Sequence, residues 1–135
     1  MTTRAEPPIS ELAKPFWDAT RERRLVLQRC RPCDRAIHYP REACPRCLGR
    51  DLEWRAASGR GVVHAFTVNH VAGNPAMEDR VPYVVALVDL DEGVRIMTNV
   101  VGCTPASVRV GMPVEVAWEG LSDGRALPVF SPRGP

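Results

Sequence analysis

Residues 30–47, CRPCDRAIHYPREACPRC, hold four of the chain's five cysteines as two Cys-x-x-Cys pairs with ten residues between them. Each pair can form a tight turn that points two thiolates at one spot, and two such turns together make the tetrahedral sulfur cage that zinc accepts. The pattern therefore predicts a rubredoxin-like zinc ribbon, with an iron centre or an unmetallated thiol set as the alternatives. Its one structural zinc ion would be bound by Cys30, Cys33, Cys44 and Cys47.

The predicted metal site is closed, because four thiolates leave no coordination position for water or substrate, which catalytic zinc usually keeps. The role of the metal would therefore be structural: it would fold a segment that has too few apolar residues to fold alone. Gly49, two residues after the last of these cysteines, is expected to adopt the positive backbone torsion that such turns often need.

After residues 58–61, SGRG, the sequence changes to short β-like runs. A turn signal at residues 91–93, DEG, joins two of them as a hairpin, and residues 70–80 have the composition of a loop. Five short strands separated by turns predict a small barrel of the five-stranded oligonucleotide/oligosaccharide-binding (OB) type. The strands are expected at residues 62–70, 82–90, 94–101, 111–118 and 127–130.

The part before the barrel has a helical pattern at residues 10–24, with Ser10 as a cap and Pro15 in the first turn or at an interruption. Residues 25–29 and 51–54 read as short strands on either side of the cysteines. The predicted fold is thus mainly β. It comprises an N-terminal helical segment (1–24), the zinc ribbon (25–57) and the OB-fold barrel (58–135).

The charge of the chain is unevenly distributed. Its formal net charge is only +2, yet residues 21–60 carry eleven arginines against five carboxylates, a balance of +6 that leaves −4 for the rest. Arginines around the cysteines could serve solubility alone, or they could meet an anionic partner, either a phosphate group or an acidic protein surface. The candidates for such contacts are Arg29, Arg31, Arg35, Arg41 and Arg46.

The aromatic pair Phe16 and Trp17 poses a similar choice, since these rings could pack on the barrel or anchor another subunit. Cys103, in the run VVGCTP, is expected to fill a strand end rather than to act as a nucleophile, because nothing beside it in the sequence would activate it. No acid/base pair can be named around the three histidines, for which packing or surface roles are expected. These are His38, His64 and His70.

The location of the protein is predicted from the absence of signals. No apolar run is long enough to span a bilayer, and the first residues lack the pattern of a secretory signal, so we expect a cytoplasmic protein with no membrane contact. In a reducing cytosol, paired cysteines more often hold a metal than form disulfides.

The order of motifs along the chain resembles the DUF35 family, in which a zinc ribbon precedes an OB fold and which is associated with acyl-CoA metabolism. The resemblance covers about residues 15–130. It rests on PFWDA (15–19), LVLQRC (25–30), YPRE (39–42), SGRG (58–61), PYVVALVDLDEG (82–93), VRVGMPVEV (108–116) and LPVF (127–130).

This resemblance implies a non-catalytic accessory subunit that joins a thiolase-fold enzyme, sometimes with a MaoC-like hydratase, acting on coenzyme A thioesters. The favoured case is an aldolase that splits a β-hydroxyacyl-CoA by retro-aldol cleavage in steroid side-chain degradation. Catalytic residues would then belong to the partner in a hetero-oligomer. The basic ribbon and the helix would pack on that partner and contribute to the groove for the CoA phosphates or adenine.

Two other functions remain as alternatives. Zinc ribbons and OB barrels also bind single-stranded nucleic acid, but the low net charge, a single lysine (Lys14) and the lack of an aromatic stacking row argue against it here. An independent enzyme using Cys103 is the weakest alternative, because no catalytic set accompanies that thiol.

Overall fold

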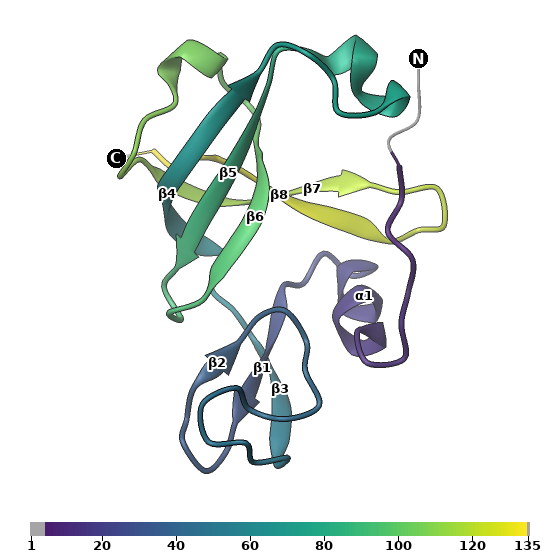
Figure 1. The fold of residues 1–135 in the computed structure, drawn as a ribbon, viewed down its shortest axis with the longest axis vertical. Coiled ribbons are helices and arrows are strands. Elements are labelled where there is room, and N and C mark those ends of the chain that lie inside the picture. The colour runs from purple at the N-terminus through teal and green to yellow at the C-terminus, as the bar shows by residue number, and fades with distance from the viewer. Residues whose placement is uncertain (1–4, 135) are drawn as a thin grey trace.

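The computed structural model describes residues 5–134 as a small three-stranded sheet joined to a five-stranded barrel (Figure 1). The small sheet has the strand order β2-β1-β3, and the barrel closes in the order β4-β5-β6-β8-β7, which confirms the mainly β fold. The elements are α1 (Lys14–Thr20), β1 (Val26–Cys30), β2 (Ala36–Ile37), β3 (Leu52–Ala56), β4 (Arg60–Asn69), η1 (Pro75–Arg80), β5 (Tyr83–Leu90), β6 (Arg95–Val100), η2 (Pro105–Ser107), β7 (Pro113–Gly120) and β8 (Ala126–Pro132).

The barrel has the strand order of a five-stranded OB fold. All its neighbouring strands are antiparallel except β6 and β8, which run parallel and meet at one registered pair, Val100 and Phe130. Side chains along β5 alternate between fully buried and half-buried, as expected for a strand with one face on a core. The predicted turn at residues 91–93 is present, with Gly93 at φ 91° and its N–H donating to the Leu90 carbonyl.

The ribbon sheet is built on β1, which pairs with β2 on one side and with β3 on the other. The cysteine loops lie at one end of this sheet, and the other end adjoins the barrel (Figure 1). Leu25, directly before β1, and Leu27, its second residue, belong to the buried core cluster that contains the barrel residues. The ribbon is therefore rooted in the barrel at one end of its central strand.

The N-terminal helix is shorter than predicted, because α1 covers seven residues and not residues 10–24. Ser10 lies in the preceding turn, where its Oγ accepts the N–H of Ala13 at 3.1 Å, and Pro15 lies in the first helical turn. The chain leaves the helix through Arg23, whose φ of 58° is left-handed. The predicted loop 70–80 contains the short 3-10 helix η1.

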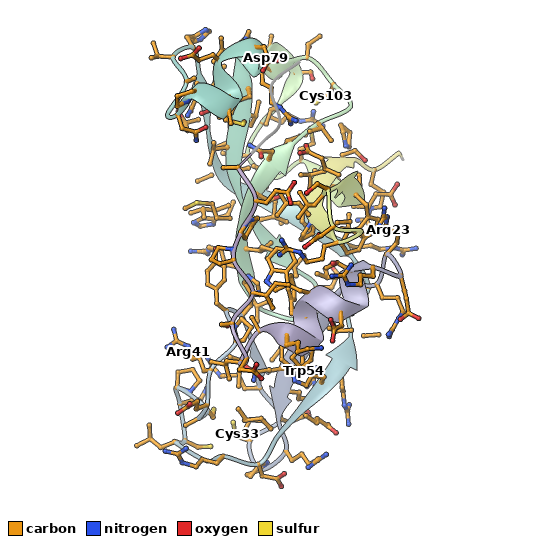
Figure 2. All side chains as sticks on the ribbon, turned by 90° about the vertical axis from the view of Figure 1, so that its right-hand side faces the viewer. Arg23, Cys33, Arg41, Trp54, Asp79 and Cys103 are labelled. Carbon is orange, nitrogen blue, oxygen red and sulfur yellow. The ribbon has the colours of Figure 1, made fainter. Side chains whose placement is uncertain are left out.

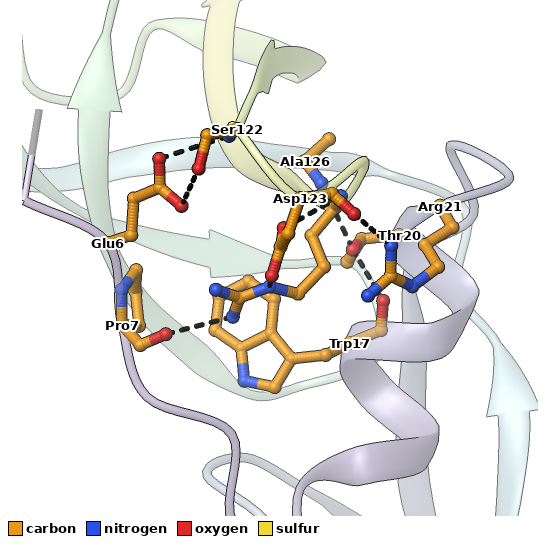
Figure 3. Close-up of polar contacts among 9 residues, drawn as sticks. Glu6, Pro7, Trp17, Thr20, Arg21, Ser122, Asp123 and Ala126 are labelled. Atoms are coloured by element: carbon orange, nitrogen blue, oxygen red, sulfur yellow. Dashed lines mark hydrogen bonds and ion pairs between the residues drawn. The ribbon is translucent and has the colours of Figure 1, made fainter. Parts of the chain in front are cut away.

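A polar cluster around Arg125 ties α1 and the segment before it to the turn between β7 and β8 (Figure 3). Arg125 is 4% exposed; its Nε donates to Asp123 Oδ2 at 2.7 Å and its Nη1 to the carbonyl oxygen of Pro7 at 2.9 Å. Its guanidinium lies over the Trp17 ring, 4.9 Å from the centroid, within the range of a cation–π contact. The hydroxyl of Thr20 accepts the N–H of Ala126 at 3.2 Å.

Candidate metal centre and ribbon surface

The four predicted zinc ligands lie together at the tip of the ribbon, and all four sulfurs are within 4.8 Å of one another. The Sγ atoms of Cys30 and Cys47 are 3.5 Å apart, and those of Cys33 and Cys44 are 3.6 Å apart. Sulfurs held at about 2.3 Å from a central zinc ion form a tetrahedron with edges of about 3.8 Å. The distances and the all-sulfur donor set therefore fit one zinc ion with no open position.

The two Cys-x-x-Cys turns have the same backbone hydrogen bonds. Cys30 donates its N–H to the carbonyl of Arg35, five residues on, and its own carbonyl accepts the N–H of Asp34. Cys44 repeats both bonds with Gly49 and Leu48. In each turn the fourth residue after the first cysteine is left-handed, with φ 59° at Asp34 and 63° at Leu48.

The prediction for Gly49 was wrong, because the positive torsion lies one residue earlier, at Leu48. A Cβ atom at position 49 would lie 3.3 Å from the Cys47 sulfur, which is a tight contact. The N–H of Gly49 also points at that sulfur, with N and Sγ 3.4 Å apart. The glycine therefore leaves room for a thiolate ligand and donates to it.

The thiols influence one another's protonation. Backbone N–H groups of Cys47 and Arg46 outweigh desolvation and lower the pKa of Cys44 to about 6. The N–H of Cys33 acts in the same direction on Cys30, but burial and the neighbouring sulfurs raise the pKa of that thiol to about 12. Several thiolates this close repel one another, so a dication is needed to hold all four deprotonated together.

The ribbon arginines fall into two groups. Arg31 forms ion pairs with Asp51 at 2.6 Å and Glu53 at 3.2 Å, and Arg29 forms one with Asp34 at 3.0 Å. The guanidinium groups of the other three candidates are exposed and have no ion pair among residues 5–134. These are Arg35, Arg41 and Arg46; Arg41 lies beside the cysteine loops in Figure 2.

Phe16 and Trp17 are buried, 6% and 8% exposed, in the core that α1 shares with the barrel. Their rings meet edge to face, with centroids 5.1 Å apart. Both rings thus pack on the barrel, which was one of the two predicted alternatives. Contact of their remaining surface with another subunit stays a prediction.

The other chemically versatile residues are scattered. Cys103 is half-buried near the pole of the barrel away from the ribbon (Figure 2), and His64 lies on the outer barrel surface beside Asp89 and Arg95. Burial lowers the pKa of His38 to about 4. In the part of the chain that the structure describes, no histidine is hydrogen-bonded to a cysteine or a serine, so no pair of a histidine base with such a nucleophile is formed there.

Two family models together match most of the chain. Residues 17–53 match the rubredoxin-like zinc ribbon domain of ChsH2, and residues 54–119 match the C-terminal OB-fold domain of ChsH2. No helix among residues 5–134 has both the length and the apolar character needed to cross a membrane.

Two relatives and one solved structure show how the chain compares with whole proteins. It is 44% identical over 121 residues to a probable enoyl-CoA hydratase alpha subunit of Thermomonospora curvata. The match covers 89% of this chain but only 37% of that subunit, so this chain spans about a third of the length of that relative. It is 36% identical to a DUF35 domain-containing scaffold protein of Methanocaldococcus jannaschii, covering 79% of this chain and 77% of that protein. A chain in the structure of an Ltp2-ChsH2(DUF35) aldolase matches with a TM-score of 0.84 and 41% identity, over 94% of this chain and 98% of that one.

Proposed function

The chain belongs to the DUF35 family, and from this membership we propose that it is a non-catalytic accessory subunit of a thiolase-fold enzyme that acts on acyl-CoA thioesters. The favoured partner is a retro-aldolase of steroid side-chain degradation. In this proposal the chain stabilises the partner and shapes its channel for CoA and substrate in the cytoplasm. A MaoC-like hydratase is a further candidate member of the assembly.

The observation that carries the proposal is the match to the DUF35 chain of the Ltp2-ChsH2 aldolase. Its 94% and 98% coverage means that the ribbon, the helix and the barrel all correspond, so that the two chains share one complete module. The relative in Thermomonospora, named a hydratase alpha subunit, carries the same module as part of a longer chain. A module that matches most of one scaffold protein and only part of a longer hydratase subunit is expected to act beside a catalytic domain.

The chemistry of the chain supports an accessory role. The candidate zinc site is closed by four sulfurs, and His38, with a pKa near 4, is neutral at physiological pH and too weak a base for general catalysis. Among residues 5–134, the candidates Arg35, Arg41 and Arg46 have exposed guanidinium groups without an ion pair, as does Arg50, and we assign the three candidates to an acidic partner surface or to CoA phosphates. Arg29 and Arg31 are partly neutralised by their carboxylate partners.

The proposal is tested by native mass spectrometry of the tagged chain recovered gently from its own host. We expect one zinc ion per chain and a co-purifying thiolase-like protein whose activity on an acyl-CoA thioester falls when this chain is removed. A zinc-bearing chain that brings down nucleic acid, or no partner at all, would overturn the accessory-subunit proposal. Salt-sensitive binding to single-stranded DNA would then favour the nucleic-acid alternative.

Charge reversal tests the arginine assignment separately. Arg41→Glu combined with Arg46→Glu should weaken partner or CoA binding by roughly tenfold, as expected for truncating charged contacts at an interface. The control is Arg109→Glu, on an exposed residue two positions after η2 and outside the ribbon. Equal affinity in the double variant and the control would exclude these arginines from the interface.

A further inference from the structure

A pocket opens where the N-terminal segment, the ribbon and the barrel meet. Its volume is about 330 Å³, within the range of small-molecule sites. β6 and β8 are paired at Val100 and Phe130, and the pocket lies beside the part of these strands where they are no longer paired. Its walls include Pro7, Trp17, His38, Tyr39, Met97 and Leu127.

The walls of this pocket are apolar and are lined mainly by residues with rings. None of its lining residues carries a charge at neutral pH, and seven of the eleven are prolines, histidine or aromatic residues. Met97 is 61% exposed at its rim, where a flexible thioether can adapt to the shape of a ligand. Such a lining suits a neutral ring system and disfavours a carboxylate or phosphate, because no lining residue is a cation and the nearby Arg125 is already paired with Asp123.

Two walls of the pocket are held in place from behind. Arg125 binds the Pro7 carbonyl and covers the face of Trp17, while its own charge is paired with Asp123 (Figure 3). Leu127, which lies in β8 two residues after Arg125, lines the pocket from the barrel side. A pocket with fixed walls loses little conformational entropy when a ligand binds.

One polar group of the pocket wall lacks a partner. The Nε2 atom of His38 is buried and has no hydrogen bond to any residue that the structure describes. A buried polar atom in this state costs free energy until something satisfies it. Nε2 is enclosed by its neighbours, so a bond to a molecule in the pocket requires the imidazole to rotate about χ2, a torsion that is broad for histidine.

We propose that this pocket binds a neutral, ring-bearing apolar molecule that carries a hydroxyl group, and that the hydroxyl bonds to His38. A hydroxyl can donate or accept, so it suits either tautomer of a neutral imidazole. Burial keeps that imidazole neutral, with a pKa of about 4. The pocket lies within this chain, so the proposal stands apart from the identity of any partner subunit.

The test uses the zinc-loaded full chain and three bicyclic probes: 5-indanol, indane and indane-5-carboxylate. NMR titrations should show 5-indanol binding roughly fivefold more tightly than indane, the effect of one net hydrogen bond, and indane-5-carboxylate at least about tenfold more weakly than 5-indanol. The imidazole signals of His38 should shift on binding, and those of His64 and His70 should not. Absence of binding, equal affinity for 5-indanol and indane, or shifts at the other histidines would overturn the proposal.

Variants separate the hydroxyl contact from apolar binding. His38→Phe should bind both 5-indanol and indane with similar affinity, whereas His70→Phe, on an exposed loop residue, should keep the preference. If His38→Phe does not fold, the His38 shift in the natural chain decides alone. Exclusion of 5-indanol from the pocket in an assembled complex would assign the pocket to the subunit interface and overturn the small-molecule proposal.

Discussion

The ribbon and the barrel are stabilised in different ways. The buried cluster at the ribbon tip consists of Cys30, Ile37 and Cys44, with Leu52 packed against it, so two of its three buried members are predicted metal ligands. The barrel core is aliphatic and aromatic throughout, and Val88, Val114 and Phe130 within it have no exposed surface. The stability of the ribbon is therefore largely a metal-binding free energy, whereas that of the barrel comes from apolar burial.

The largest effect is expected from removing one buried ligand by Cys44→Ser. Structural zinc in small domains contributes about 10 kcal/mol or more, so the ribbon tip should unfold while the barrel stays folded. Hydrogen exchange should show lost protection at residues 30–50 and kept protection in β5 and at Leu25 and Leu27, which pack in the barrel core. Cys103→Ser is the matched control; uniform loss of protection across both parts would contradict the comparison.

The converse change, Phe130→Ala, should destabilise the barrel and leave the metal site intact. Deleting a fully buried phenyl ring costs about 3–5 kcal/mol, which urea denaturation would measure. Zinc content of the folded protein should stay unchanged. Val110→Ala, at a position that is 66% exposed, should change stability by less than about 0.5 kcal/mol. Loss of zinc in folded Phe130→Ala would show that the ribbon depends on the barrel.

The junction between the parts should respond less strongly. Arg125→Met removes the hydrogen bonds to Asp123 and Pro7 and the contact with Trp17, and we expect a loss of about 2 kcal/mol by urea denaturation. Chemical shifts should change at α1 and in the turn between β7 and β8, and not at the cysteines. An unchanged stability, equal to that of the exposed control Arg109→Met, would mean that the cluster in Figure 3 does not stabilise the junction.

The smallest effect concerns pH and is confined to the barrel surface. Arg95 donates to Asp89 at 2.7 Å and holds the pKa of that carboxyl below its usual value. The ion pair of Asp89 with Arg95 therefore stabilises the fold fully above the pKa of Asp89 in the unfolded chain, about 4. This stabilisation is lost as pH falls through the lower pKa of Asp89 in the folded chain. Asp89→Asn should flatten the dependence of barrel stability on pH in that range; an identical pH profile for both proteins would rule out this contribution.

The sequence predicted the parts of the fold that depend on local patterns. The cysteine spacing placed the four ligands together, and the β-like runs with the turn at residues 91–93 placed the barrel strands. The two-residue strand β2 was missed because so short a segment has no periodicity to detect. The helix was predicted too long, since its polar flanks have helical composition but the chain turns away at Arg23.

The candidate site was less predictable where it depends on contacts distant in the sequence. Arg31 lies among the cysteines, but its carboxylate partners Asp51 and Glu53 are 20 and 22 residues away, so the sequence did not distinguish it from the unpaired Arg41. The pocket also escaped prediction, because its walls come from three parts of the chain. Its sequence signal is limited to the pair His38 and Tyr39, two ring-bearing residues between the two cysteine pairs.

The left-handed residue of the second cysteine turn has a consequence for redesign. Leu48 is 75% exposed, and its φ of 63° is a conformation that a leucine adopts at a cost of roughly 1–2 kcal/mol. Neither backbone geometry nor solubility favours leucine here, and a procedure that optimises folding alone would replace it with glycine or asparagine. That replacement would make the ribbon more robust and at the same time remove its most exposed large apolar side chain, so engineered variants of this module should be judged by assembly as well as by melting temperature.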